Sequence, residues 1–416
     1  MSRWIRLAAA VVAMIQISNL QYAWTIFVQP LRNAHPDWSL TDVQWGFSIF
    51  IAMETWAMPL TGWLIDKHGP RLLMSIGGVL CAVGWAGIGG VHSVLALYLL
   101  YGLAGLGAAI VYCGAIGVAL KWFPDRRGLA AGMIAAGFGS GATIIMIVNS
   151  IQSVRDYALA NFANTFLFTG ILQGALIILA AQFLGGSGVA PPASAKPQAT
   201  AARDTTHNFN SAEMLATRQF YWLYAMMLMM GVGGLLATAQ VSQVASNFGI
   251  GASALGISLI LNPIANGGGR FFWGWVSDRL GRERTMTIAF FIQSLSLVGV
   301  MALGPHADTP FIVGMFLVFF TWGEVYSLFP SVSADFFGRQ FASSNYSFLY
   351  STKGVASILA GGAAAWLFTS TGTWAPAFYG SAVLAMISCV MAVRLRKMPL
   401  PAKQTTPLPA MTATKA

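Results

Sequence analysis

The sequence predicts an all-α polytopic membrane protein in which twelve transmembrane helices form two pseudo-symmetric halves of six helices each. Composition is the first reason, because 56% of the 416 residues are hydrophobic and only 9% are charged, against about 25% charged residues in soluble domains. The second reason is a series of apolar windows, each about 20 residues long, which is the length of one membrane-crossing helix. The third is a loop motif that occurs once in each half and indicates an internal duplication.

The first predicted half covers residues 1–185. Its apolar windows fall near 7–28, 44–65, 72–91, 94–119, 128–152 and 162–185. The first window resembles a signal peptide at its start, but it continues into polar and aromatic positions without a small-residue cleavage site. We therefore interpret it as a retained helix.

A break in the apolar pattern separates the two halves. Residues 186–216 are rich in Pro, Ala, Ser and Thr, as expected of a cytoplasmic linker. The second half, 217–397, has apolar windows near 219–240, 253–276, 285–305, 309–333, 342–368 and 373–395. A polar tail at 398–416 is expected to be disordered.

The 23 Lys and Arg residues predict the orientation of the chain. With the N-terminus in the cytoplasm, most of them fall in cytoplasmic segments, and only Arg32 and Arg155 fall in outside loops. This positive-inside asymmetry predicts a bacterial inner-membrane protein with both termini in the cytoplasm. It also accounts for the net charge of +10 without a nucleic-acid partner.

Several kinds of site find no support in the sequence. The three cysteines, Cys81, Cys113 and Cys389, lie inside apolar windows without ligand-like spacing, so we predict neither a metal site nor a disulfide framework. The glycine-rich runs also lie inside predicted helices, away from any strand, and no nucleophile–base pair is seen. We expect neither an enzyme nor a bound cofactor.

One loop motif occurs at the same point in both halves. GWLIDKHGPR (62–71) follows the second predicted helix and GWVSDRLGRER (274–284) follows the eighth. A weaker echo pairs FPDRRGLAAG (123–132) with FFGRQFASSN (336–345). Each aspartate of the motif ends a helix, where it can pair with arginine or accept N–H groups from a helix start of the opposite half. The predicted result is a conformational latch formed by Asp66, Arg71, Asp278 and Arg282, with a solvated turn as the alternative.

Two basic residues, Arg270 and Lys353, lie deep inside apolar windows. At a rise of ~1.5 Å per residue, they are about 12 Å and about 16 Å from the cytoplasmic ends of their helices. A charge at the bilayer centre costs several kcal/mol, so such residues usually face an aqueous cavity or a charged partner. Glu54 and Glu324 are the acidic residues at comparable depth.

Helical spacing indicates which side chains share a face: Tyr350 lies on the face of Lys353, and Trp322 and Tyr326 face together. The windows near 7–28 and 94–119 offer Gln21, Tyr22 and Tyr112. An anion held by two cations among aromatic groups is chemically coherent, because Arg offers a planar fork for a carboxylate and Lys offers a compact point charge. The predicted substrate-binding residues are Arg270, Lys353, Gln21, Tyr22, Tyr112, Trp322, Tyr326 and Tyr350.

A structural alternative stays open for the four buried charges. Arg270 could pair with Glu324, and Lys353 could pair with Glu54, which would leave a neutral core. Alternatively, Glu54 or Glu324 could carry a proton, because burial moves a carboxyl group toward the neutral form at working pH.

These motifs carry a family resemblance. The duplicated loop resembles the signature loop of the major facilitator superfamily, and with the twelve spans this resemblance covers essentially the whole chain. Segments near the deep charges resemble the oxalate/formate antiporter family of that superfamily: SNLQYAWTIFVQPLR, LKWFPDRRGLAAGMIAAGFG, ANGGGRFFWGWVSDRLGR, FFTWGEVYSLFPS and NYSFLYSTKGVASILAGG.

The resemblance implies a role for each matched position. In that family an arginine on helix 8 and a lysine on helix 11 bind the oxalate dianion, and they match Arg270 and Lys353. The aromatic cage of the family corresponds to Tyr22, Tyr112, Trp322, Tyr326 and Tyr350, with Gln21 as a polar contact. The chain departs from the family pattern at Phe138 (a tyrosine there), Tyr350 (a tryptophan there) and Glu54 (a neutral residue there).

The leading hypothesis is a secondary carrier of small carboxylate anions that works by alternating access, with oxalate/formate exchange as the specific case. The alternative is a proton-coupled symporter of monocarboxylates such as lactate or pyruvate, with Glu54 or Glu324 as the proton carrier. A cationic-drug exporter is disfavoured, because it would need an acidic central cavity rather than two deep cations.

Overall fold

The computed structural model describes residues 2–185, 205 and 207–402, and in this part of the chain all regular secondary structure is helical. The helices of the first half are α1 (Arg3–Tyr22), α2 (Trp24–Ala34), α3 (Leu40–Trp56), α4 (Met58–His68), α5 (Pro70–Ile88), α6 (Val94–Trp122), α7 (Arg127–Ser150), α8 (Gln152–Ala160) and α9 (Phe162–Gln182). Those that follow are α10 (Ser211–Leu215), α11 (Arg218–Asn247), α12 (Ala252–Leu280), α13 (Arg282–Leu303), η1 (Gly304–His306), α14 (Asp308–Trp322), α15 (Val325–Phe337), α16 (Ala342–Tyr350), α17 (Thr352–Ile358), η2 (Leu359–Ala363), α18 (Ala364–Thr371) and α19 (Ala375–Leu395).

These helices occupy all of the predicted spans. Within the described residues, 9 helical segments are long and apolar enough to cross a membrane, and 10 if the bent pair α3 and α4 counts as one span. The other two predicted spans are occupied by α7, with 24 residues, and α12, with 29 residues. The predicted twelve-helix plan is therefore confirmed.

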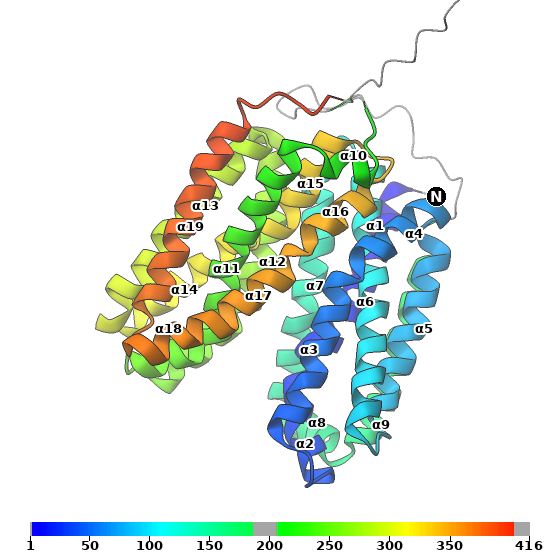
Figure 1. The fold of residues 1–416 in the computed structure, drawn as a ribbon. Helices are drawn as coiled ribbons and strands as arrows, with labels where there is room; N and C mark the ends of the chain where they lie inside the picture. The colour runs from blue at the N-terminus through cyan, green and yellow to red at the C-terminus, as the bar shows by residue number, and fades with distance from the viewer. Residues whose placement is uncertain (1, 186–204, 206, 403–416) are drawn as a thin grey trace, which may run out of the picture.

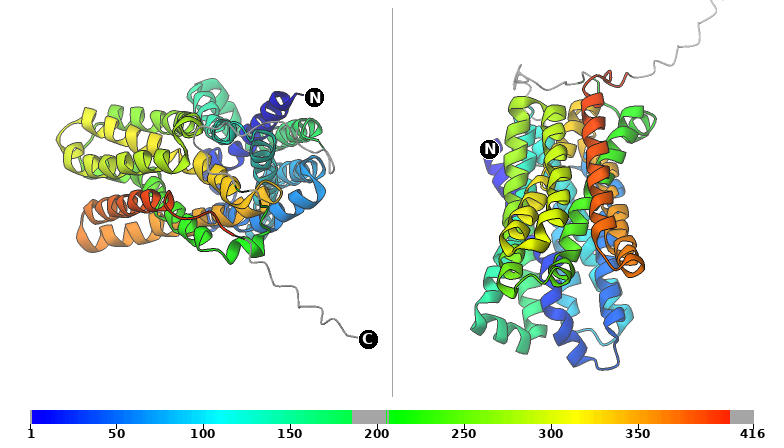
Figure 2. Two further views of the ribbon diagram at one scale, coloured as in Figure 1. Left: turned by 90° about the horizontal axis from the view of Figure 1, so that it is seen from above. Right: turned by 90° about the vertical axis from the view of Figure 1, so that its left-hand side faces the viewer.

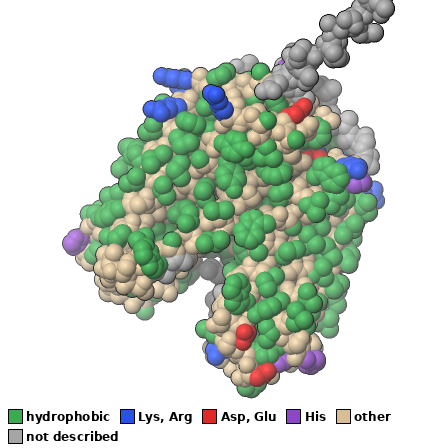
Figure 3. Space-filling model, in the orientation of Figure 1, with side chains coloured by type: hydrophobic (Ala, Val, Ile, Leu, Met, Phe, Trp, Pro, Cys, Tyr) green, Lys and Arg blue, Asp and Glu red, His purple; other side chains and the backbone are tan. Residues whose placement is uncertain are grey.

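Two bundles lie side by side, α1–α9 in one and α11–α19 in the other (Figure 1). They meet at the end that carries the N-terminus and α10, and they diverge toward the other end (Figure 1). Seen from above, the two bundles lie next to each other (Figure 2). The space-filling view shows a notch between the bundles at that diverging end (Figure 3). The structure is thus closed on the side of the termini and open on the opposite side.

The connection between the halves is described only in part. Most of the predicted linker, 186–216, and the tail from 403 onward lie outside the described residues. The last part of the linker packs on the loop between α15 and α16. There, the Asn208 side chain accepts hydrogen bonds from the backbone N–H groups of Arg339 and Gln340 at 3.0 and 3.1 Å.

Four predicted spans are interrupted near mid-length, which the apolar windows did not indicate. Breaks fall at Ala23, at Ala57, at Gly323–Glu324 and at Ser351. In each case a residue predicted for the site lies within three positions of the break. Interrupted helices at the middle of a membrane are typical of transporter binding sites, because backbone groups there face a cavity rather than lipid.

Candidate functional site

A cavity of about 460 Å³ lies between the two halves. Its wall includes every predicted substrate-binding residue: Gln21, Tyr22, Tyr112, Arg270, Trp322, Tyr326, Tyr350 and Lys353. The structure therefore brings together side chains from α1, α6, α12, α14, α15, α16 and α17. A pocket of this size fits a small ligand together with water.

Arg270 has neutral partners in this structure. Its Nε donates to Asn266 Oδ1 at 2.9 Å, and its Nη1 donates to the carbonyl oxygen of Ala135, on α7 of the other half, at 2.7 Å. The guanidinium lies over the Tyr326 ring, 4.5 Å from its centroid. The side chain is buried, and among the described residues no carboxylate forms an ion pair with it. A buried guanidinium in this position retains the capacity to bind an anion.

Lys353 is held by a carboxylate of the other half. Its Nζ lies 3.1 and 3.3 Å from the two oxygens of Glu54, and it donates to the Tyr350 hydroxyl at 3.0 Å. The Tyr350 hydroxyl also lies 3.4 Å from Glu54 Oε1. Glu54 is fully buried, whereas Lys353 reaches the cavity wall. Of the two ion pairs in the structural alternative, this one forms.

The other ion pair of that alternative does not form. Glu324 lies in the break between α14 and α15 and is fully buried. Neither of its carboxylate oxygens has a hydrogen-bond partner among the described residues. It does not line the central cavity. The two deep carboxylates are therefore not equivalent, since only Glu54 contacts a cavity cation.

Aromatic side chains form a continuous wall beside Lys353. Phe138 lies between Tyr22 and Tyr112, with ring centroids 5.7 and 6.0 Å away. Tyr350 contacts both Tyr112, at 4.7 Å, and Tyr326, at 6.0 Å. The electropositive ring edges and the tyrosine hydroxyls can contact a small anion while the cations hold its oxygens.

Several lining residues were not predicted from the sequence: Phe47, Leu235, Thr238 and Asn262. Asn262 had a usable signal, because it precedes Asn266 by four residues and Arg270 by eight, and so lies on the same helical face. The signal for the other three was absent, because their positions follow from how α3 and α11 pack across the cavity.

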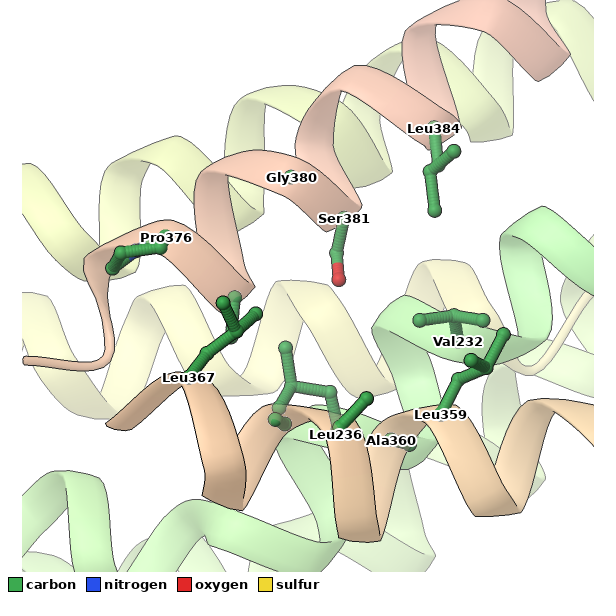
Figure 4. Close-up of a pocket in the computed structure, with 12 residues that line it drawn as sticks. Val232, Leu236, Leu359, Ala360, Leu367, Pro376, Gly380, Ser381 and Leu384 are labelled. Carbon is green, nitrogen blue, oxygen red and sulfur yellow. The ribbon is translucent and has the colours of Figure 1, made fainter. Parts of the chain in front are cut away.

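A second hollow in the structure has a different character. A groove of about 200 Å³ lies between α11, the η2–α18 segment and α19, and it is lined by apolar side chains such as Leu236, Leu367 and Leu384 (Figure 4). Among the described residues no charged residue lines it, and Ser381 is its one polar lining side chain.

The duplicated aspartates each contact the opposite half on the closed side. Asp66 accepts from the backbone N–H of Ser344, at the start of α16, at 2.7 Å. Asp278 accepts from the N–H groups of Gly128 and Leu129, at the start of α7, at 2.9 and 2.7 Å. A carboxylate at a helix N-terminus is stabilised by the helix dipole and by otherwise unpaired N–H groups.

The basic partners of these aspartates differ between the halves. Arg282 Nη1 donates to Asp278 at 2.6 Å. In the first half the corresponding partner is Lys121, whose Nζ lies 2.6 Å from Asp66. Arg71, which was predicted for the latch, instead donates to Gln182 of its own half at 2.9 Å. The reason is its place in the first turn of α5, which packs against α9.

Two further charged residues that join the halves on the closed side, Asp335 and Arg127, were not predicted from the sequence. Asp335, at the end of helix α15, forms buried ion pairs with Arg127 of the first half and with Arg282, the latter at 3.0 Å. The weak echo between FPDRRG and FFGRQF had marked this region, but it did not indicate which acidic residue would meet Arg127.

The first glycine of each duplicated motif allows close approach between the halves. A Cβ on Gly62 would lie 2.5 Å from Ser347 Oγ and 2.8 Å from the Ser343 carbonyl oxygen. A Cβ on Gly274 would collide with the carbonyl oxygen of Gly128. Both contacts join the two halves on the closed side.

We expect Gly274→Ala to shift the protein away from the conformation described here, because its Cβ meets rigid backbone of the opposite half. Spin labels at the exposed positions Lys67 and Gln340, in a background without the native cysteines, would report the separation of the halves on this side. The labels should move apart in the variant. As a control, Gly256→Ala, with open space around its Cβ, should leave the distance distribution unchanged. An unchanged distribution in Gly274→Ala would contradict the role of this contact.

Two helical bundles with a central cavity between them, joined by polar contacts at one end, have the architecture of a membrane transporter. The chain belongs to the major facilitator superfamily, whose family model matches residues 7–340 and 221–414. It is 38% identical over 395 residues to the oxalate:formate antiporter of Oxalobacter formigenes, covering 94% of this chain and 91% of that protein.

More distant comparisons agree with this family. Human monocarboxylate transporter 11 is 27% identical over 253 residues, which cover 59% of this chain and 50% of that protein. The crystal structure of the Escherichia coli fucose:proton symporter superposes with a TM-score of 0.72 at 13% identity, covering 95% of this chain and 99% of that chain. At that identity the likeness shows the fold alone.

Proposed function

We propose that this transporter carries small carboxylate anions through the central cavity, with Arg270 and Lys353 as its anion-binding groups. The observation that carries the proposal is that both cations lie in the wall of one cavity between the two halves. The antiporter relative supports the same substrate class. In the membrane, the closed side faces the cytoplasm, as the positive-inside asymmetry predicts.

Exchange of one carboxylate for another is the mode we favour. The Nε and Nη1 atoms of Arg270 already donate to fixed partners. A bound carboxylate would accept hydrogen bonds from the remaining N–H groups of the guanidinium. The bound anion lowers the cost of enclosing a cation when the open side closes. The polar contacts on the closed side would form the latch, which releases when the carrier reopens toward the cytoplasm. Its residues are Asp66, Asp278, Arg282, Lys121, Arg127 and Asp335.

Proton-coupled symport of a monocarboxylate is the second candidate, and the Glu54–Lys353 pair favours it. When Glu54 and Lys353 are both ionised, these two residues and Arg270 together carry one net positive charge. This charge matches a monoanion. A dianion would need Glu54 to leave Lys353 or to take up a proton. The distant monocarboxylate transporter relative fits this candidate. Glu324, which lies away from the cavity, is the weaker candidate for the proton carrier.

Counterflow in proteoliposomes tests the two candidates against each other. Vesicles loaded with unlabelled formate or oxalate should take up labelled oxalate without any pH gradient if the protein is an exchanger. Uptake of labelled lactate or pyruvate that requires a pH gradient, and that collapses with a protonophore, would support the symporter. Absence of both activities, in vesicles shown to contain folded protein, would overturn the carboxylate proposal.

A further inference from the structure

A second polar cavity, of about 160 Å³, lies on the closed side where α7 meets α12. Its wall combines Arg126 and Leu129 of the first half with Trp275, Asp278 and Arg279 of the second. It is separate from the substrate cavity, with which it shares no lining residue. The proposed function makes no use of its two arginines.

The acidic groups near this cavity have other partners. Asp278 accepts from two backbone N–H groups of α7 and from Arg282. Asp125 is bound by both terminal nitrogens of Arg3, at 2.6 and 2.9 Å, and lies 3.9 Å from Arg126 Nε. Arg279 lies over the Trp275 ring, 3.9 Å from its centroid, and forms no ion pair among the described residues. Two guanidinium groups therefore keep donors available for an anion.

An apolar stripe leads to this cavity along α12. Phe271, Trp275 and Arg279 are spaced by four residues and so share one helical face. Phe271 is 47% exposed and Trp275 is 38% exposed, on a helix that spans the membrane. Tryptophan and arginine at the end of such a stripe are typical of the boundary between acyl chains and headgroups.

We propose that this cavity binds the headgroup phosphate of an anionic phospholipid, with Arg126 and Arg279 as its ligands and an acyl chain along Trp275 and Phe271. Basic pockets between membrane helices on the cytoplasmic side bind anionic headgroups in this way. Because the two arginines belong to opposite halves, the lipid bridges the halves in the closed-side conformation. It therefore favours the state described here over the state that opens toward the cytoplasm.

The test measures lipid retention by native mass spectrometry and thermal stabilisation of the purified full chain in detergent. The probes are phosphatidylglycerol, phosphatidylcholine and inorganic phosphate. We expect phosphatidylglycerol to be retained and to raise the melting temperature more than phosphatidylcholine, and phosphate alone to have no effect. Since each basic residue near the surface contributes about a factor of five, the double change Arg126→Gln and Arg279→Gln should weaken retention about 30-fold.

A matched pair of substitutions keeps the test specific. Arg394 and Lys397 are exposed at the end of α19, on the same side of the membrane but outside the cavity. Arg394→Gln with Lys397→Gln should retain the lipid as the unaltered protein does. Equal retention by the Arg126 and Arg279 variant would overturn the proposal, as would equal stabilisation by inorganic phosphate. If the double variant does not fold, lipid retention is compared for Arg126→Gln and for Arg279→Gln separately.

Discussion

Replacing Arg270 with glutamine should reduce carboxylate counterflow to the level of empty vesicles. Truncating one partner of a buried charge pair costs about 2–5 kcal/mol, which corresponds to a loss of affinity of roughly 30-fold to several thousand-fold. Arg270 forms no ion pair with a described carboxylate, so its charge is available to the substrate, and the substitution otherwise removes its hydrogen bonds to Asn266 and Ala135. Initial rates of labelled-carboxylate uptake, at several concentrations, measure it.

Arg270→Lys should lose nearly as much carboxylate counterflow as Arg270→Gln, because an ammonium group cannot make the same set of hydrogen bonds as the guanidinium. Lysine cannot hold Asn266 and the Ala135 carbonyl oxygen while presenting a planar fork to a carboxylate. Arg394→Gln, which removes an exposed arginine far from the cavity, is the control and should transport normally. Normal transport by a folded Arg270→Gln variant would show that the anion binds elsewhere.

Glu54→Gln should change which anions the protein prefers. The substitution leaves Lys353 without its carboxylate and raises the net charge of the cavity groups from one positive to two. Dicarboxylates should then gain affinity relative to monocarboxylates by about tenfold or more, since a full charge at ion-pair distance is worth more than ~1.4 kcal/mol at the effective dielectric of a protein. Competition of oxalate and formate against one labelled substrate measures the ratio. If uptake is proton-coupled through Glu54, its dependence on a pH gradient should disappear in the same variant.

Glu324→Gln is the matched control for this experiment. It also removes a buried carboxylate, but one that contacts no cavity cation among the described residues. The preference between dicarboxylate and monocarboxylate should stay unchanged. If the preference shifted in Glu324→Gln but not in Glu54→Gln, Glu324 rather than Glu54 would select the charge of the substrate. Loss of proton coupling in Glu324→Gln would identify Glu324 as the proton carrier.

The sequence was sufficient to predict the helical plan and eight residues of the cavity wall, although not Phe47, Leu235, Thr238 or Asn262. Apolar windows predict membrane spans because the bilayer sets their length. Arg270 and Lys353 were identifiable because a deep charge is costly and therefore has a purpose. Helical spacing then placed Tyr350 on the face of Lys353. Tyr326 was predicted from its spacing to Trp322 and from the aromatic cage of the oxalate/formate antiporter family.

The sequence could not decide which of the possible contacts between the halves form. Glu54 and Lys353 are separated by 299 positions, and nothing local to either residue distinguishes this pairing from the alternatives. The same holds for Arg127 with Asp335. The repeated motif also led to the prediction that Arg71 contacts Asp66. The contacts of Arg71 depend on how α5 packs against α9, and the motif does not indicate this packing. The helix breaks were missed because Ala23, Ala57, Gly323 and Ser351 are small residues that occur inside continuous helices as well, and Glu324 lies within an uninterrupted apolar window.

The central claim is that one anion is held by cations of the cavity wall, and thermal stabilisation by a panel of small carboxylates tests it most directly. A ligand that binds only the folded protein raises its melting temperature by mass action. We predict that at least one carboxylate stabilises the unaltered protein and that the shift is lost in both Arg270→Gln and Lys353→Gln. An undiminished shift in both variants, each folded and inserted, would contradict the account.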